Sequence, residues 1–154
     1  MRLNAGEINI IANNDAALNA TDLAAGSASW YAIDGATGAL VAPGTAGTVK
    51  YATSGTADYT LVRASGSSFE GMTNPGGNSV GAAALALLKA HGCFPVAASG
   101  LGGDGFWVDV TGERVPVRGG IWSYVAQGGV FARGVTYARS LASPDIGARP
   151  AFVS

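Results

Sequence analysis

The most distinctive stretch of this sequence spans residues 113–122 and reads ERVPVRGGIW. Gly119 and Gly120 lack a Cβ atom, so they permit a tight turn or a close approach of two backbones. Trp122 follows them, and its ring offers a large apolar area for burial. A loop-rich fold leaves buried backbone carbonyls without strand partners, so we expect arginines near this turn to bond to them.

Three further blocks follow this stretch in order. Residues 128–131 read GGVF, residues 138–140 read ARS, and residues 146–152 read IGARPAF. The guanidinium group of arginine donates hydrogen bonds in a planar fork that matches a carboxylate. We therefore interpret most block residues as structural, with internal ion pairs that join Arg114, Arg139 and Arg149 to Glu113, Asp104 or Asp145.

The order and spacing of these four blocks resemble the C-type-lectin-like fold of bacteriophage virion proteins. The same fold type occurs in relatives of formylglycine-generating enzymes and in variable proteins of diversity-generating retroelements. Those relatives carry R-G-G-x-W, A-G-V-F-like, R-S and I-G-F-R-x-A segments, and Ala148 stands here where they usually have an aromatic residue. The resemblance covers about residues 69–154. Its fold-defining residues here are Glu113, Arg114, Arg118, Gly119, Gly120, Trp122, Phe131, Arg139, Ser140, Gly147 and Arg149.

The resemblance implies an α+β fold with short twisted antiparallel strands, one or two helices and long glycine-rich loops. It also implies that the loops between the blocks, at residues 123–127, 133–137 and 141–145, form the binding surface. The candidate contact residues on that surface are Ser123, Tyr124, Gln127, Arg133, Tyr137, Ser143 and Asp145.

Apolar alternation and turn residues predict the remaining elements. We expect strands at residues 8–10, 30–33, 40–42, 49–51, 59–62, 106–110, 115–117, 121–125, 130–132 and 151–153. A helix is predicted over residues 79–90, with Asn78 or Ser79 as its cap and Gly92 just past its end. A weaker helix is predicted over residues 15–25. We assign residues 45–154 to the C-type-lectin-like domain and residues 1–44 to an N-terminal arm or subdomain that oligomerises or docks.

Glycine and charge content narrow the class of protein. The chain has 154 residues, of which 24 are glycine, 48% are hydrophobic and 12% are charged. The glycines follow no three-residue period, which excludes collagen. Because surface charge keeps small domains dispersed, such a low charge predicts that the chain covers its surface with copies of itself or with a partner. The resemblance to virion proteins implies a homotrimer.

The charges are unevenly distributed although the formal net charge is -1. Residues 111–154 hold five arginines and two acidic residues. Internal pairing explains this segment, and phosphate binding is the alternative. The chain as a whole has no basic field of the kind that binds nucleic acid.

The sequence indicates neither an enzyme nor a cofactor. Cys93 is the only cysteine, so no intrachain disulfide forms, and the paired cysteines of formylglycine-generating enzymes are missing. His91 and Cys93 have no further histidine or cysteine to complete a zinc site. Calcium requires six to eight oxygen ligands, which we cannot assemble from the sequence. A reactive Cys93 or a carboxylate pair among Glu70, Asp104, Asp109 and Glu113 is the alternative enzymatic interpretation.

We therefore expect a non-enzymatic virion structural protein, made in the bacterial cytoplasm without an export signal or a membrane-inserted segment. Its expected role is to decorate or cement the capsid, in contact with itself and other virion proteins. The first alternative is a tail fibre or tail-tip protein that binds a glycan or protein on the host surface. The second is a stand-alone carbohydrate-binding module that stacks a sugar on Trp122, Tyr124 or Tyr137.

Overall fold

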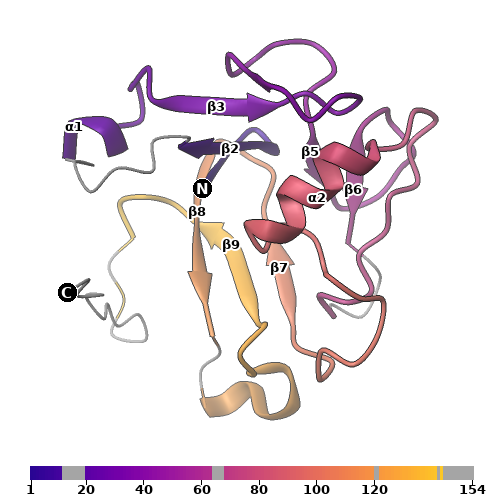
Figure 1. The fold of residues 1–154 in the computed structure, drawn as a ribbon. Coiled ribbons are helices and arrows are strands. Elements are labelled where there is room, and N and C mark those ends of the chain that lie inside the picture. Colours follow the sequence, from indigo (N-terminus) through magenta and orange to yellow (C-terminus); the bar gives the residue numbers. More distant parts are fainter. Residues whose placement is uncertain (12–19, 64–67, 120–121, 142, 144–154) are drawn as a thin grey trace, which may run out of the picture.

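The computed structural model describes residues 1–11, 20–63, 68–119, 122–141 and 143, with the backbone alone at 122–124. Within these residues nine strands form one mixed sheet, accompanied by two α-helices and a 3-10 helix (Figure 1). A mixed sheet with few helices confirms the α+β class that the sequence predicts.

The sheet has a continuous path with one side branch. The strands are β1 (Arg2–Asn4), β2 (Glu7–Ile11), β3 (Trp30–Ile33), β4 (Leu40–Val41), β5 (Lys50–Ala52), β6 (Thr60–Val62), β7 (Phe106–Val108), β8 (Glu113–Arg118) and β9 (Arg133–Tyr137). The helices are α1 (Ala20–Leu23), α2 (Ala82–Ala90) and the 3-10 helix η1 (Trp122–Gln127). The path runs β4-β3-β2-β1-β8-β9-β7, and β5 pairs with β2 and β6. The pairs β5–β6 and β7–β9 are parallel, whereas we expected antiparallel strands.

A hairpin from the first residues of the chain lies at the centre of this path. β1 and β2 are joined by Ala5 and Gly6, both with positive φ, as a two-residue hairpin turn requires. β1 pairs with β8 on its other side, and β2 pairs with β3 and β5. The sheet thus runs across residue 44, where the sequence analysis ends the arm, and no break in strand pairing coincides with that boundary.

The hydrophobic core is organised around the ring of Phe106 in β7. Its centroid lies 5.2 Å from that of Tyr51 in β5 and 5.7 Å from that of Phe69. Ala84 and Leu88, on the buried face of α2, belong to the same core cluster. The helix, β5 and β7 therefore share one core.

The strong helix prediction is confirmed for α2, although the helix begins at Ala82 rather than at residue 79. Gly81 occupies the N-cap position, so the prediction of Asn78 or Ser79 as the cap is wrong. Both residues have other partners, because Asn78 donates to Asp58 and the hydroxyl of Ser79 donates to backbone carbonyls. Of the weaker helix, residues 20–23 are helical and residues 15–19 lie outside the described part.

The C-terminal third differs most from the strand predictions. Residues 122–127 form η1 rather than a strand, and Val130–Ala132 form part of a turn. β9 occupies residues 133–137, where we expected a loop, with Arg133 and Val135 buried on one face. The inward-facing arginine hides the alternation that identifies a strand, which explains the missed element. The expected strand at residues 151–153 lies outside the described part.

Candidate functional site

The first two sequence blocks meet at one end of the sheet. Arg118 ends β8, and Gly119 follows with a φ of +82°. The N–H of Gly119 donates to the carbonyl of Ala132 at 2.9 Å, which ties the turn after β8 to the turn before β9. The positive φ explains why a glycine follows the arginine, because a residue with a Cβ is disfavoured in that conformation.

Asp104 anchors the second of these turns. Its buried carboxylate accepts a hydrogen bond of 2.7 Å from the N–H of Phe131. A Cβ on Gly129 would lie 2.1 Å from this carboxylate, so the GGVF block requires a glycine there. The result is a fixed position for the ring of Phe131. We expected Asp104 as an arginine partner. No described arginine pairs with it, and Arg149, one of its possible partners, lies outside the described residues.

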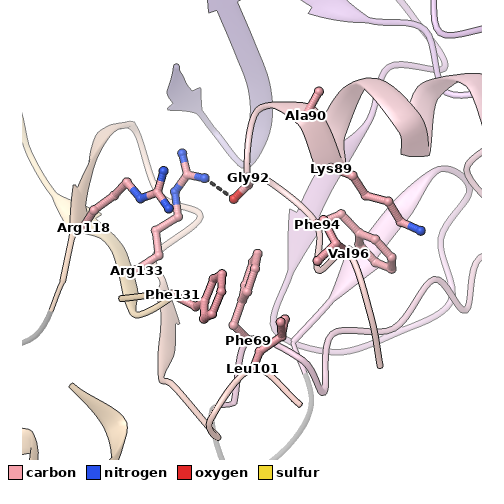
Figure 2. Close-up of a pocket in the computed structure, with 10 residues that line it drawn as sticks. All are labelled: Phe69, Lys89, Ala90, Gly92, Phe94, Val96, Leu101, Arg118, Phe131 and Arg133. Atoms are coloured by element: carbon pink, nitrogen blue, oxygen red, sulfur yellow. Dashed lines mark hydrogen bonds between the residues drawn. The ribbon is translucent and has the colours of Figure 1, made fainter. Parts of the chain in front are cut away.

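A cavity of about 180 Å³ opens beside this turn, next to the C-terminal end of α2. Figure 2 shows aromatic rings on its walls and basic side chains at two of its edges. Its lining residues are Phe69, Lys89, Ala90, Gly92, Phe94, Val96, Leu101, Arg118, Phe131 and Arg133. Of these, the sequence analysis singled out Arg118, Phe131 and Arg133. The others are apolar, small or helix-end residues far apart in the chain, and they carry no sequence signal of a site.

Arg133 binds the backbone at the C-terminal end of α2. It is 5% exposed, which corrects the prediction that it lies on an exposed loop surface. Its Nη1 donates to the carbonyls of His91 and Gly92, which follow the last residue of α2. Helix C-termini have carbonyls without intrahelical partners and a negative dipole end, so a buried guanidinium is stabilised there. Its Nε is buried without a hydrogen-bond partner.

Glu113 and Arg139 form a second cluster away from the cavity. The carboxylate of Glu113 accepts bonds of 2.9 and 2.8 Å from Arg139 and one of 3.0 Å from Arg2. The pairing of Arg139 with Glu113 is one of the several pairings that the sequence left open. The cluster joins β8, β1 and the segment after β9, which is a structural role. The bonds from Arg139, followed by those from Arg2, lower the pKa of Glu113.

Arg114 pairs with Asp109, a residue that the sequence analysis did not name as its partner. Its Nε and Nη2 donate to one oxygen of Asp109 at 2.9 and 2.6 Å. Thr111 donates to the other oxygen from its hydroxyl and its N–H. These bonds, those from Thr111 first, lower the pKa of Asp109 to about 2. The carboxylate fixes a turn and is not poised as a general acid.

Acid should weaken the Glu113 cluster, and this gives a test of its role. A carboxylate whose pKa falls on folding stabilises the protein above its ordinary pKa of 4.5, and this contribution is lost as the pH falls through the folded value. We expect Glu113→Gln to lower the free energy of unfolding by about 1 kcal/mol at pH 7. We also expect it to flatten the decline in stability below pH 4.5. Urea unfolding from pH 7 to pH 3 measures both effects, and parallel curves for the two proteins would contradict the assignment.

Two of the remaining candidate contact residues lie toward opposite ends of β9. Gln127 is exposed at the end of η1, whereas Tyr137 is half-buried at the far end of β9, where it pairs with Val115. Five strand residues span about 13 Å, so these two side chains do not act on one small ligand. Ser140 is exposed in a turn, and Ser143 is half-buried. Several predicted residues lie outside the described part of the chain. These are Gly120, Asp145, Gly147 and Arg149, together with the side chains of Trp122, Ser123 and Tyr124.

Two observations on the described residues bear on the thiol and metal interpretations of the sequence. Burial raises the pKa of the Cys93 thiol, and the thiolate is the reactive form. No group of three His, Cys, Asp or Glu side chains suited to a metal occurs in the described ranges. No helix among them is long and apolar enough to cross a membrane. Neither a protein-family model nor a curated protein sequence matches the chain.

Proposed function

We propose that this chain is a non-enzymatic structural protein of a bacteriophage particle, displayed on the capsid as a homotrimer with a decoration or cementing role. The order of the four sequence blocks supports a C-type-lectin-like domain within the α+β fold. The observation that carries the proposal is a group of exposed apolar side chains around the η1–β9 turn. We name this group the contact end, and it comprises Val96, Val125, Val130 and Phe131.

The contact end has the properties of a surface that another protein covers. Val125, Val130 and Val96 are 86%, 76% and 62% exposed, which places large apolar areas in water. Val96 and Phe131 both line the cavity, Val125 lies in η1, and Val130 directly precedes Phe131 in the turn after η1. Clustered exposed apolar side chains mark protein contact sites. With only 12% of its residues charged, the chain has few charges to keep this surface free.

Charges placed on the contact end should separate the copies. We expect the wild-type protein to elute as an oligomer, and the double variant Val125→Asp, Val130→Asp to elute as a monomer at micromolar concentration. Buried apolar contacts at an interface do not tolerate unpaired carboxylates. Size-exclusion chromatography with light scattering measures the mass. Leu40→Asp, on the exposed face of β4, is the matched control and should remain oligomeric. A dilute, stable wild-type monomer would remove the homotrimer from the proposal.

The position of the protein on the particle tests the role directly. Antibody labelling spread over the capsid is the expected result. Labelling confined to the tail would replace the capsid role with the second candidate, a receptor-binding tail protein. The cavity favours that second candidate, because it offers basic and aromatic side chains to a ligand beside the contact end.

A further inference from the structure

The cavity beside α2 gathers positive charge that no described carboxylate neutralises. The ion pairs among the described residues involve Arg2, Arg114 and Arg139, and not the two arginines of the cavity. Arg118 is exposed at the edge of the cavity, and its side chain makes no hydrogen bond or ion pair with any described residue. The nearby acids are already engaged, because Glu70 accepts the N–H of Leu101 and Asp104 accepts that of Phe131.

The two guanidinium groups converge on one place. A Cβ on Gly92 would lie 3.3 Å from Nη1 of Arg133 and 3.9 Å from Nη1 of Arg118. Figure 2 shows the two groups next to one another at the edge of the cavity. Arg133 is only 5% exposed, and its Nε has no hydrogen-bond partner among the described residues. Nη1 of Arg133 donates to the carbonyls of His91 and Gly92, and its Nη2 contacts the sulfur of Met1. Arg133 therefore brings positive charge to the cavity, and Arg118 brings the unused donors.

The walls of the cavity are apolar, which restricts the kind of ligand that the cavity can hold. Phe69, Phe94 and Phe131 supply aromatic walls, and Val96 and Leu101 complete them. A bare inorganic anion would leave these walls uncovered. A nucleotide is too large, since ligands of drug size occupy pockets of roughly 300–1,000 Å³ and this cavity measures about 180 Å³. A metal cation is repelled by the arginines.

We propose that this cavity binds a small organic carboxylate with an apolar body. The carboxylate accepts hydrogen bonds from Arg118 and is attracted by the positive charge of Arg133, and the body packs against the rings of Phe69 and Phe131. Guanidinium groups favour carboxylates because their forked N–H groups match the two oxygens. The same chemistry is offered by a free aromatic or aliphatic acid and by the C-terminal carboxylate of a peptide that ends in an apolar residue. The proposal does not rest on the virion role, although Val96 and Phe131 belong both to the cavity and to the contact end.

A titration of the full chain with phenylacetate at low salt tests the proposal, and calorimetry or NMR chemical shifts measure the binding. We expect saturable binding, and at least tenfold weaker binding of acetate and of the neutral isostere phenylacetamide. Arg118→Gln should weaken phenylacetate binding at least fivefold, and Arg118→Lys should weaken it less. Arg118 makes no contact that the fold requires, so these variants should remain folded. Arg139→Gln changes the charge equally, lies outside this cavity and should bind as the wild type does.

The comparison of ligands distinguishes a free organic acid from a peptide C-terminus, and it shows which part of the proposal is wrong if one fails. N-Acetylphenylalanine that binds more tightly than phenylacetate identifies a peptide terminus, and the reverse order identifies a free acid. Equal binding of phenylacetamide would overturn the role of the arginines. Equal binding of acetate or inorganic phosphate would overturn the role of the apolar walls. Absence of saturable binding at millimolar phenylacetate, or an unchanged Arg118→Gln variant, would overturn the proposal as a whole.

Discussion

Replacing Phe106 with alanine is expected to lower the free energy of unfolding by about 3–5 kcal/mol. The side chain is completely buried, and its ring packs against Tyr51 and Phe69. Truncation removes apolar contacts to β5 and to the segment before α2, and it leaves a cavity that a close-packed core fills only in part. Urea unfolding followed by tryptophan fluorescence measures the change as a lower midpoint at a constant slope.

Tyr31→Ala is the matched control for Phe106→Ala. Tyr31 lies in β3 and is 38% exposed, so its truncation also removes an aromatic ring, but one that is partly in water. We expect it to cost less than about 1.5 kcal/mol. Similar losses for the two variants would mean that the core is not centred on Phe106.

The second large effect is expected at Glu7, where alanine should cost about 2–3 kcal/mol. Glu7 is buried in β2, and its carboxyl group accepts bonds from Asn9 at 2.8 Å, Thr48 at 2.6 Å and the N–H of Gly44 at 3.0 Å. Alanine removes the acceptor of all three bonds, and the side chains of Asn9 and Thr48 are buried, although the Thr48 hydroxyl keeps the carbonyl of Thr45 as a second acceptor. Chemical denaturation at pH 7 measures the loss.

A double-mutant cycle with Thr48→Val separates the hydrogen bond from general disruption. Because Thr48 donates its hydroxyl to Glu7, we expect the two substitutions to be coupled by about 1 kcal/mol. Additive losses would contradict a direct bond, and a loss below about 0.5 kcal/mol for Glu7→Ala alone would contradict the buried network.

Local patterns located most elements of the chain correctly. Alternation at residues 8–10 predicts a strand that the structure extends to β2, and the apolar run before Lys89 predicts α2. These predictions succeed because strand and helix periods are properties of adjacent residues. They fail at η1, where an uninterrupted Trp-Ser-Tyr-Val run resembles a strand, and at β9, where a buried arginine occupies an inward position.

The candidate site was predictable only in part. The Arg118-Gly119 turn and the GGVF block are visible as motifs, and both border the cavity. The bond that fixes the GGVF turn is not visible in the sequence, because its acceptor Asp104 is 27 residues from Phe131 in the chain. The apolar walls come from segments between Phe69 and Phe131, and nothing in their spacing indicates that they meet.

The sequence by itself determined the positions of most strands and of the helix α2, and the resemblance of its four blocks implied the α+β class. Only the tertiary structure decided that the first hairpin lies inside the sheet, that Arg133 is buried against the end of α2, and that Arg118 joins it at an apolar cavity. The physical reason is the range of the interactions. Strand and helix formation depends on neighbouring residues, whereas burial and charge convergence depend on which distant segments the sheet brings together.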